Sequence, residues 1–258
     1  MILRSQFSLI AVLLFSTFSI HAQTLTFSYE DRENPPYFYQ NKDDPSKHSG
    51  VTIDVLRLVA KRLSFKIEFV RLPWLRGLLK LKHNKIDGVF HSSFKSKRME
   101  YGLYPMTEEG IDNSRMLMVQ RYYLYTHKDS KLHWNGEKFS HLKGSIGALN
   151  GYAIVSDLEN KGISIKKSEN LLPLLHQIQE ERLEGMVNLE NMTDALIKNN
   201  PSELEHVIKI SPPVKEKSYF LMLSHGFYKS QPELSNSIWN EIKNIKDSGD
   251  YQRILNTY

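Results

Sequence analysis

The chain contains 258 residues, with 34 Lys and Arg, 29 Asp and Glu, and no Cys. This length allows one large domain or two small ones, with a sizeable core. The absence of Cys excludes disulfides, a thiolate nucleophile and a cysteine-based metal site. Basic residues are interspersed with acidic ones, which argues against a nucleic-acid-binding surface.

Residues 1–22 have the organisation of a secretory signal peptide. Arg4 lies in a short basic start, Phe7–Ile20 is almost wholly apolar, and the segment ends at the small residue Ala22. The apolar run is shorter than the ~20 residues that a membrane anchor needs, so we expect cleavage after Ala22. Without Arg4, 33 basic and 29 acidic residues would remain, a formal charge of +4. Because no Cys can carry a lipid, we expect a soluble protein of the bacterial periplasm and not a lipoprotein.

The first predicted elements after this segment are a strand, a loop and a helix. Thr24–Tyr29 alternates apolar and polar residues, which is typical of a strand. The loop Glu30–Gln40 contains two prolines that fix its path, and its Asn34 and Tyr37 are candidate ligand contacts. Gly50–Ser64 carries apolar residues on one helical face.

A second strand, a second helix and a third strand follow. Phe65–Val70 again alternates, and Pro73 occupies the first turn of a helix, where its missing N–H costs nothing. Ile86–Phe90 is a short apolar run that suits a buried strand. The order strand, helix, strand, helix, strand predicts a parallel sheet with right-handed crossovers.

Polar residues follow the third strand. We expect His91–Ser93 to form a turn at the carboxyl end of that strand, with Arg98 just beyond it. In open α/β sheets, ligands bind outside the carboxyl ends of the strands. The hydroxyls of Ser92 and Ser93 and the guanidinium of Arg98 would therefore suit a carboxylate or another anion. From the sequence alone, Arg98 could equally be a surface residue in a basic run.

The second half of the chain repeats the α/β pattern between two long segments. Ser114–Thr126 is strand-like, and we place a crossing between domains near residues 118–128. Ser218–Ser224 is again strand-like and could cross back to the first lobe, and Ser230–Ser248 is a long amphipathic helix. We therefore expect one lobe of residues 24–118 plus 223–258 and a second lobe of residues 119–222.

Within the second lobe, the start of one helix is a candidate binding site. Asn150, Gly151 and Tyr152 open a helix after the strand Ser145–Leu149, and the free N–H groups of that helix could hold an anion. A plain capped helix is an equally good interpretation. Further on, the strand Leu183–Leu189 precedes the helix Glu190–Asn199. Ser168 is a plausible N-cap for the helix between these regions.

Taken together, these segments resemble the bacterial periplasmic solute-binding proteins, specifically the extracellular family 3 type that serves polar amino-acid uptake. The resemblance covers nearly the whole chain after residue 22. It implies an α/β two-lobe periplasmic-binding-protein fold (type II), with two βα sheets joined by a double-strand hinge. The segments that carry it are Pro35–Tyr37, Gly50–Leu56, Lys61–Leu63, Pro73–Arg76, Lys85–Gly88, Lys97-Arg98, Lys143–Gly151, Arg182–Gly185 and Gly249–Leu255.

The resemblance also implies roles for particular residues. In such proteins the first lobe offers hydroxyls and an Arg to the ligand carboxylate, which here implies Ser92, Ser93 and Arg98. The second lobe contributes an acid to the ligand amino group, but this chain has Asn188, Leu189 and Glu190 where an Asp is expected. Glu190 can substitute if its strand runs one residue further. Otherwise a standard α-amino acid becomes doubtful as the ligand.

Other candidates have both a binding and a structural interpretation. Trp74 and Tyr37 could stack on a ligand or belong to the core, and Arg76 could face the cleft or the solvent. Glu30 is a weaker candidate. The complete set of expected ligand contacts is Asn34, Tyr37, Trp74, Arg76, Ser92, Ser93, Arg98, Asn150, Gly151, Tyr152, Asn188 and Glu190.

We therefore expect a binding protein that captures a small polar or anionic, amino-acid-like solute for ABC-type uptake. Its partners would be this ligand and a membrane permease or receptor, without nucleic acid, cofactor or metal, and it would act as a monomer. Two alternatives remain open: a soluble ligand sensor for a receptor, or an enzyme on the same fold that resembles a cyclohexadienyl dehydratase. Glu30, Glu184 or Glu190 could supply the acid of such an enzyme. A nucleophile–base pair of Ser92 and His91 is disfavoured, because adjacent strand residues face opposite ways.

Overall fold

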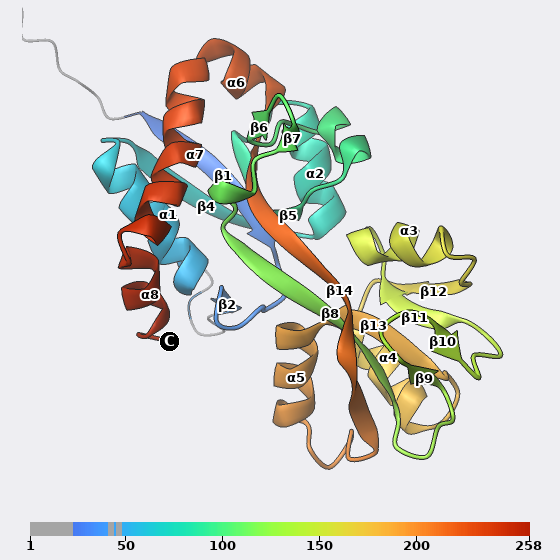
Figure 1. The fold of residues 1–258 in the computed structure, drawn as a ribbon. Coiled ribbons are helices and arrows are strands. Elements are labelled where there is room, and N and C mark those ends of the chain that lie inside the picture. Colours follow the sequence, from blue (N-terminus) through green and yellow to red (C-terminus); the bar gives the residue numbers. More distant parts are fainter. Residues whose placement is uncertain (1–22, 41–43, 45–47) are drawn as a thin grey trace, which may run out of the picture.

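The computed structural model describes residues 23–40, 44 and 48–258, so the predicted signal peptide lies outside the described residues. Its main feature is an eight-stranded sheet with the order β12-β11-β13-β8-β14-β5-β1-β4. Figure 1 shows two halves of the molecule, joined by the long strands β8 and β14. Within the described residues, no helix has an apolar stretch long enough to span a bilayer.

The first half is built on three parallel strands. β1 (Thr24–Glu30) lies between β4 (Lys66–Leu72) and β5 (Gly88–Ser93). The crossovers are α1 (Val51–Arg62) and α2 (Trp74–Lys82). This confirms the predicted order of elements, in which apolar residues at helical spacing alternate with short strands.

One prediction in this half was wrong. The expected polar turn at residues 91–93 is part of β5, and all six residues of that strand are buried. His91 has a φ of 61°, in the left-handed region that few non-glycine residues adopt. Tertiary contacts on both sides of the strand hold these polar side chains, which is why local polarity did not indicate the strand.

Two antiparallel strands join the halves. β8 (Met118–His127) pairs with β13 and with β14 (Val207–Leu223), and β14 also pairs with β5. The sequence pattern predicts a strand at Ser218–Ser224, whereas β14 begins at Val207 and is continuous over 17 residues. Its register shifts between Ile210 and Lys215. Pro212 and Pro213 lie in this irregularity, where the missing N–H groups are not required by the ladder.

The second half has three further strands, β11 (Ile146–Leu149), β12 (Ile165–Ser168) and β13 (Gly185–Leu189). Three helices accompany them: α3 (Ala153–Glu159), α4 (Leu171–Gln179) and α5 (Glu190–Asn199). Ser168 is not the N-cap of α4, which begins after Asn170. Instead, the Ser168 hydroxyl accepts a hydrogen bond of 3.2 Å from the Asn170 N–H.

The C-terminal segment returns to the first half. The expected helix Ser230–Ser248 corresponds to α7 (Pro232–Asp247), and an additional short helix that was not predicted, α6 (His225–Ser230), precedes it. Gly249, with a φ of 79°, ends α7, and α8 (Asp250–Leu255) follows. In Figure 1, α7 and α8 lie beside α1. The remaining short elements are β2 (Tyr39–Gln40), β3 (His48–Ser49), β6 (Met106–Thr107), β7 (Gly110–Ile111), β9 (His133–Trp134), β10 (Phe139–Ser140) and two 3-10 turns at Ser96–Glu100 and Asn113–Arg115.

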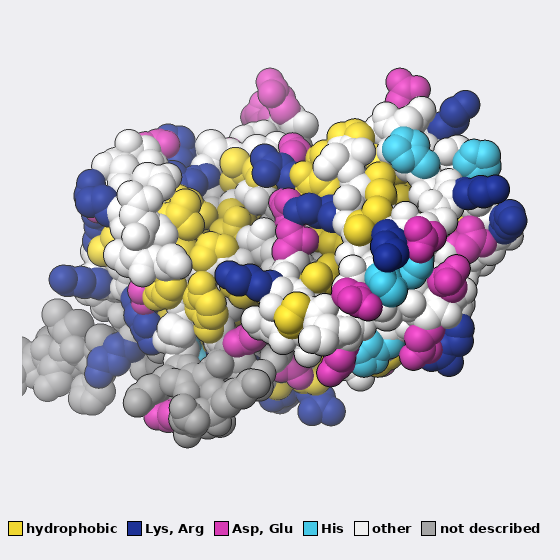
Figure 2. Space-filling view, turned by 90° about the horizontal axis from the view of Figure 1, so that it is seen from below, with side chains coloured by type: hydrophobic (Ala, Val, Ile, Leu, Met, Phe, Trp, Pro, Cys, Tyr) yellow, Lys and Arg dark blue, Asp and Glu magenta, His cyan; other side chains and the backbone are white. Residues whose placement is uncertain are grey.

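The face seen in Figure 2 carries Lys, Arg, Asp and Glu side chains interspersed with one another. No large area of a single sign is visible on that face. This arrangement agrees with the sequence pattern, in which no dense basic block occurs.

Candidate functional site

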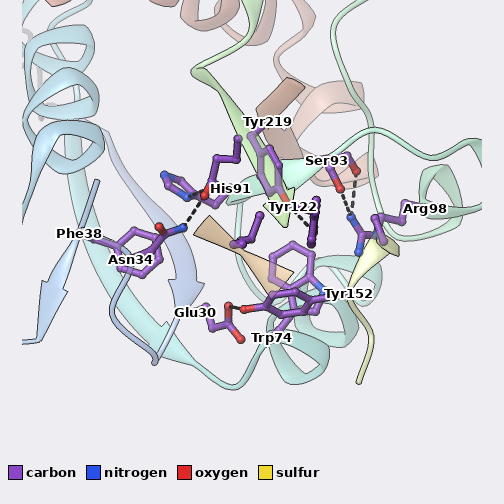
Figure 3. Close-up of a pocket in the computed structure, with 13 residues that line it drawn as sticks. Glu30, Asn34, Phe38, Trp74, His91, Ser93, Arg98, Tyr122, Tyr152 and Tyr219 are labelled. Carbon is purple, nitrogen blue, oxygen red and sulfur yellow. Dashed lines mark hydrogen bonds between the residues drawn. The ribbon is translucent and has the colours of Figure 1, made fainter. Parts of the chain in front are cut away.

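A cavity lies between the two halves, close to the carboxyl ends of β1 and β5 (Figure 3). Its volume is about 20 Å³, which is room for about one water molecule. Charged, amide, imidazole and aromatic side chains surround it. The lining residues are Glu30, Asn34, Phe38, Trp74, His91, Ser93, Arg98, Gln120, Tyr122, Tyr152, Ala153, Leu189 and Tyr219.

Arg98 is a buried cation at one side of this cavity. It is 8% exposed, and its Nη1 donates hydrogen bonds of 2.9 Å to both the carbonyl and the hydroxyl oxygen of Ser93. Its Nη2 donates another of 2.9 Å to the carbonyl of Gly151, in the other half of the molecule. Its guanidinium carbon lies 5.2 Å from the ring centroid of Trp74. Among the described residues, Arg98 therefore meets neutral oxygens and a ring face, but no carboxylate.

Glu30 is the buried anion of the cavity. Its carboxylate accepts hydrogen bonds from Tyr152 Oη and from Arg32 Nη1. Burial raises the pKa of the Glu30 carboxyl above its ordinary value, and the charge of Arg32 opposes this shift. Burial and the adjacent Glu30 together raise the pKa of the Tyr152 hydroxyl well above its ordinary value. Tyr152 therefore stays a neutral donor to Glu30.

A chain of neutral polar groups forms a third side of the cavity. His91 Nε2 lies 2.8 Å from Thr52 Oγ1, and His91 Nδ1 lies 3.3 Å from Gln120 Nε2. Gln120 Oε1 in turn accepts a hydrogen bond of 2.9 Å from Asn34 Nδ2. Burial lowers the pKa of His91 to about 3, so the imidazole is neutral at ordinary pH. The Oδ1 atom of Asn34 is buried and has no partner among the described residues.

The two joining strands supply the back of the cavity. Tyr122 of β8 and Tyr219 of β14 share a hydrogen bond of 2.7 Å between their hydroxyls, and both are buried. Burial raises the pKa of both hydroxyls, so both groups remain protonated. In Figure 3 the side chains of Tyr122 and Tyr219 lie between His91 and Arg98.

The structure brings five of the twelve expected residues to the cavity: Asn34, Trp74, Ser93, Arg98 and Tyr152. Ser92, on the same strand as Ser93, points away, and its hydroxyl lies 2.6 Å from that of Tyr104. This follows from the strand, in which adjacent side chains face opposite sides. Arg76 is exposed on α2, outside the cavity lining.

Three others lie at the margin. The Tyr37 ring packs edge-on against His91, with centroids 5.4 Å apart, and is not among the residues that line the cavity. Gly151 contributes its carbonyl to Arg98. Asn150 donates a hydrogen bond of 2.7 Å to Glu169 at the surface.

The facing segment of the second half differs from the expected pattern. β13 ends at Leu189, so Glu190 is the first residue of α5 rather than the last of the strand. Its carboxylate pairs with Lys209 at 2.8 Å. Asn188 is fully buried and donates a hydrogen bond of 3.0 Å to Thr193. Neither residue lines the cavity.

Sequence reasoning did not select several residues that line the cavity, among them Phe38, Gln120, Tyr122, Ala153, Leu189 and Tyr219. Gln120 and Tyr122 are separated by one residue on β8, so the strand period places them on one face. That period was visible in the sequence, but it did not indicate which face meets the cleft.

Known proteins identify the family of this chain. Residues 29–258 match the bacterial extracellular solute-binding proteins, family 3. The chain belongs to this family. Its members are solute-binding proteins, and the two-lobe α/β fold predicted from the sequence is confirmed.

The known proteins that this chain resembles are distant from it in sequence. The L-cystine-binding protein TcyA of Bacillus subtilis (strain 168) is 23% identical over 221 residues, which span 85% of this chain and 75% of that protein. A probable histidine-binding protein of Neisseria gonorrhoeae is 19% identical over 224 residues, spanning 85% and 78%. A histidine kinase sensor domain similar to periplasmic binding proteins superposes with a TM-score of 0.73 at 16% identity, covering 92% of this chain and 96% of its own.

Proposed function

We propose that this family 3 protein binds a small, amino-acid-like carboxylate in the cavity between its two halves. The observation that carries the proposal is Arg98. A buried guanidinium is costly unless an anion compensates its charge, and among the described residues Arg98 has only neutral oxygen partners. A ligand carboxylate would complete this site with charge-assisted hydrogen bonds. Two similar proteins are named as a cystine-binding and a probable histidine-binding protein, and this supports an amino-acid-like ligand.

We further propose that binding is coupled to closure of two lobes, residues 24–118 plus 223–258 and residues 119–222. Two contacts between these lobes support a closed arrangement. Arg98 donates to the Gly151 carbonyl, and Asp157 of α3 lies 3.3 Å from Lys95. A ligand that touches both lobes favours the closed state, because it gains contacts there that the open state lacks.

In this proposal the protein binds its ligand without converting it. The only acid in the cavity lining, as far as the described residues extend, is Glu30, which Arg32 and Tyr152 already engage. The imidazole of His91 is held between Thr52 and Gln120 and is neutral. These groups are arranged for hydrogen bonding to a bound solute rather than for proton transfer.

The biological setting is also part of the proposal. Residues 1–22 would direct export to the periplasm and be removed, and the loaded protein would deliver its solute to an ABC-type permease. A soluble sensor that reports to a membrane receptor is the second candidate. The likeness to a histidine kinase sensor domain suggests this candidate but shows only the fold. Uptake of the solute by cells that lack and then regain this protein separates the two roles.

The decisive experiment is mass spectrometry of small molecules released when the purified protein is denatured. We expect a carboxylate, and we expect the same compound to raise the melting temperature of ligand-free protein. A broad screen of amino acids and organic acids in which nothing raises the melting temperature would contradict the proposal. Turnover of the released compound by the protein would contradict the binding-only role.

A further inference from the structure

A second hollow lies directly outside the cavity, and the binding of a single carboxylate does not account for it. It is an open groove of about 690 Å³, bounded by the loop after β1 and by α4 and α5. Its lining is largely apolar and includes three side-chain amides. The lining residues are Arg32, Glu33, Pro35, Asn170, Leu171, Leu172, Pro173, Met192, Ala195, Leu196, Asn199 and Asn200. We call this hollow the outer groove.

Only a thin wall of side chains separates the outer groove from the cavity. Arg32 lines the groove and donates a hydrogen bond to Glu30, which lines the cavity. Met192 lines the groove, and its sulfur lies 3.5 Å from the Tyr152 hydroxyl oxygen. In Figure 3 the Tyr152 ring lies across the cavity with its hydroxyl toward Glu30. These contacts place the Tyr152–Glu30 pair between the two spaces.

The sizes of the two spaces favour a ligand that occupies both. The cavity of about 20 Å³ holds about one water molecule, whereas the groove of about 690 Å³ lies within the range of small-molecule sites. The largely apolar lining suits an uncharged, partly apolar group. The amides of Asn170, Asn199 and Asn200 are suitable partners for polar groups of an extended ligand.

The side chains opposite Arg98 also favour a ligand that has no ammonium group next to its carboxylate. A free amino acid bound there would bring an ammonium group, but among the described residues no acid of the second half lines the cavity. Glu190 pairs with Lys209 at 2.8 Å, and Asn188 is buried against Thr193. In a peptide, the corresponding nitrogen is an uncharged amide, which needs only a hydrogen-bond acceptor.

We propose that the outer groove is a second subsite and that the ligand is a short peptide. Its C-terminal carboxylate binds Arg98, its peptide amide passes the Tyr152–Glu30 pair, and an apolar residue before the amide fills the groove. This inference rests on the proposed function, since it uses the same carboxylate site. It adds the length and chemical class of the ligand.

The test compares matched ligands on the intact protein by calorimetric titration. Each standard amino acid is measured beside the dipeptide in which Leu is added to its amino group. We expect at least one Leu-containing dipeptide to bind at least about tenfold more tightly than its free amino acid. Amidation of the C-terminal carboxylate of that dipeptide should abolish its binding.

Two variants of α5 locate the subsite. Ala195→Trp fills the groove and should weaken the dipeptide about tenfold while leaving binding of the free amino acid unchanged. Lys198→Trp places the same side chain on an exposed position outside the groove lining and should change neither. Melting temperatures of the free variants verify folding.

The outcomes separate this inference from the proposed function. If free amino acids bind at least as tightly as every dipeptide, the peptide proposal is overturned and the carboxylate site stands. Equal weakening of both ligands by Ala195→Trp also overturns it. If neither class binds and denaturation releases no carboxylate, both proposals fail.

Discussion

Arg98 Nη2 donates a hydrogen bond of 2.9 Å to the main-chain carbonyl of Gly151, which lies 53 residues further along the chain. This contact joins the two halves of the molecule at the edge of the cavity. Because a carbonyl is a neutral acceptor, it leaves the positive charge of Arg98 uncompensated. The same guanidinium can therefore hold the halves together and attract an anion.

Replacing Arg98 tests the carboxylate site. Hydrogen bonds to charged groups contribute about 1.5–3 kcal/mol, so Arg98→Ala should weaken binding of the released carboxylate by roughly 10- to 150-fold. Arg98→Lys should restore little, because an ammonium group cannot make the bidentate contact. Calorimetric titration measures both. Arg76→Ala removes an exposed Arg outside the cavity lining and should bind as the wild type does. Normal binding by Arg98→Ala would exclude this site.

Gly151 tests closure of the lobes. It has a φ of 75°, and a Cβ atom there would lie 2.6 Å from Leu75 Cδ2 across the interface. The Cβ atom would also lie 3.0 Å from Leu75 Cγ and 3.3 Å from Trp74 Cδ1. Gly151→Ala should therefore disfavour full closure, weaken ligand binding and reduce ligand-induced compaction in small-angle X-ray scattering. Gly162 has a φ of 77°, and a Cβ atom there would meet nothing within 4 Å.

Gly162→Ala is thus the matched control. Both substitutions share the backbone cost of about 1–2 kcal/mol for an L-residue in the left-handed region. Only Gly151→Ala adds the contact between the halves. Equal compaction of the two variants in saturating ligand would show that closure does not require the close approach at Gly151.

Replacing Tyr152 tests its hydrogen bond to Glu30, which joins the two halves of the molecule. Tyr152→Phe keeps the ring and removes the donor to the buried carboxylate of Glu30. The lost hydrogen bond should leave Glu30 less well compensated and shift the ligand-free protein toward open conformations. We expect a larger radius of gyration without ligand. Tyr228→Phe, on α6 away from the cavity, should leave that radius unchanged, and no increase for Tyr152→Phe would contradict the role assigned to the pair.

His91 predicts an acid-sensitive component of stability. Its pKa falls from 6.5 to about 3 on burial, so between these values the unfolded chain takes up a proton that the folded protein does not. The free energy of unfolding should therefore decrease as pH falls from about 6.5 to about 3, by roughly 1.4 kcal/mol per unit from this residue. Glu30, whose pKa is raised, acts in the opposite direction near its own pKa.

The difference between variants isolates the contribution of His91. His91→Asn does not titrate, and Asn tolerates the left-handed φ of 61° at this position. Denaturant unfolding between pH 7 and pH 4 should show a shallower loss of stability for His91→Asn than for the wild type. His83→Asn, at an exposed position, should follow the wild-type curve. Parallel curves for His91→Asn and the wild type would contradict the prediction.

Local patterns predicted the elements well where they depend on short-range spacing. The apolar residues of α1 and the alternation of β1 follow from the periods of helix and strand, and Gly249 ends α7 as expected. The same patterns failed at β5 and β14. There, polar residues and prolines belong to strands because neighbouring strands and tertiary contacts hold them.

The sequence by itself determined the order of the α/β elements, the family, and the selection of Arg98 and Ser93 as candidate ligand contacts. These depend on residues close together in the chain. Only the tertiary structure decided how the site is completed. It joins Glu30 to Tyr152 across 122 residues, and pairs Glu190 with Lys209. Such partners are selected by the packing of distant segments, where a buried polar group must find whichever complementary group the fold brings near.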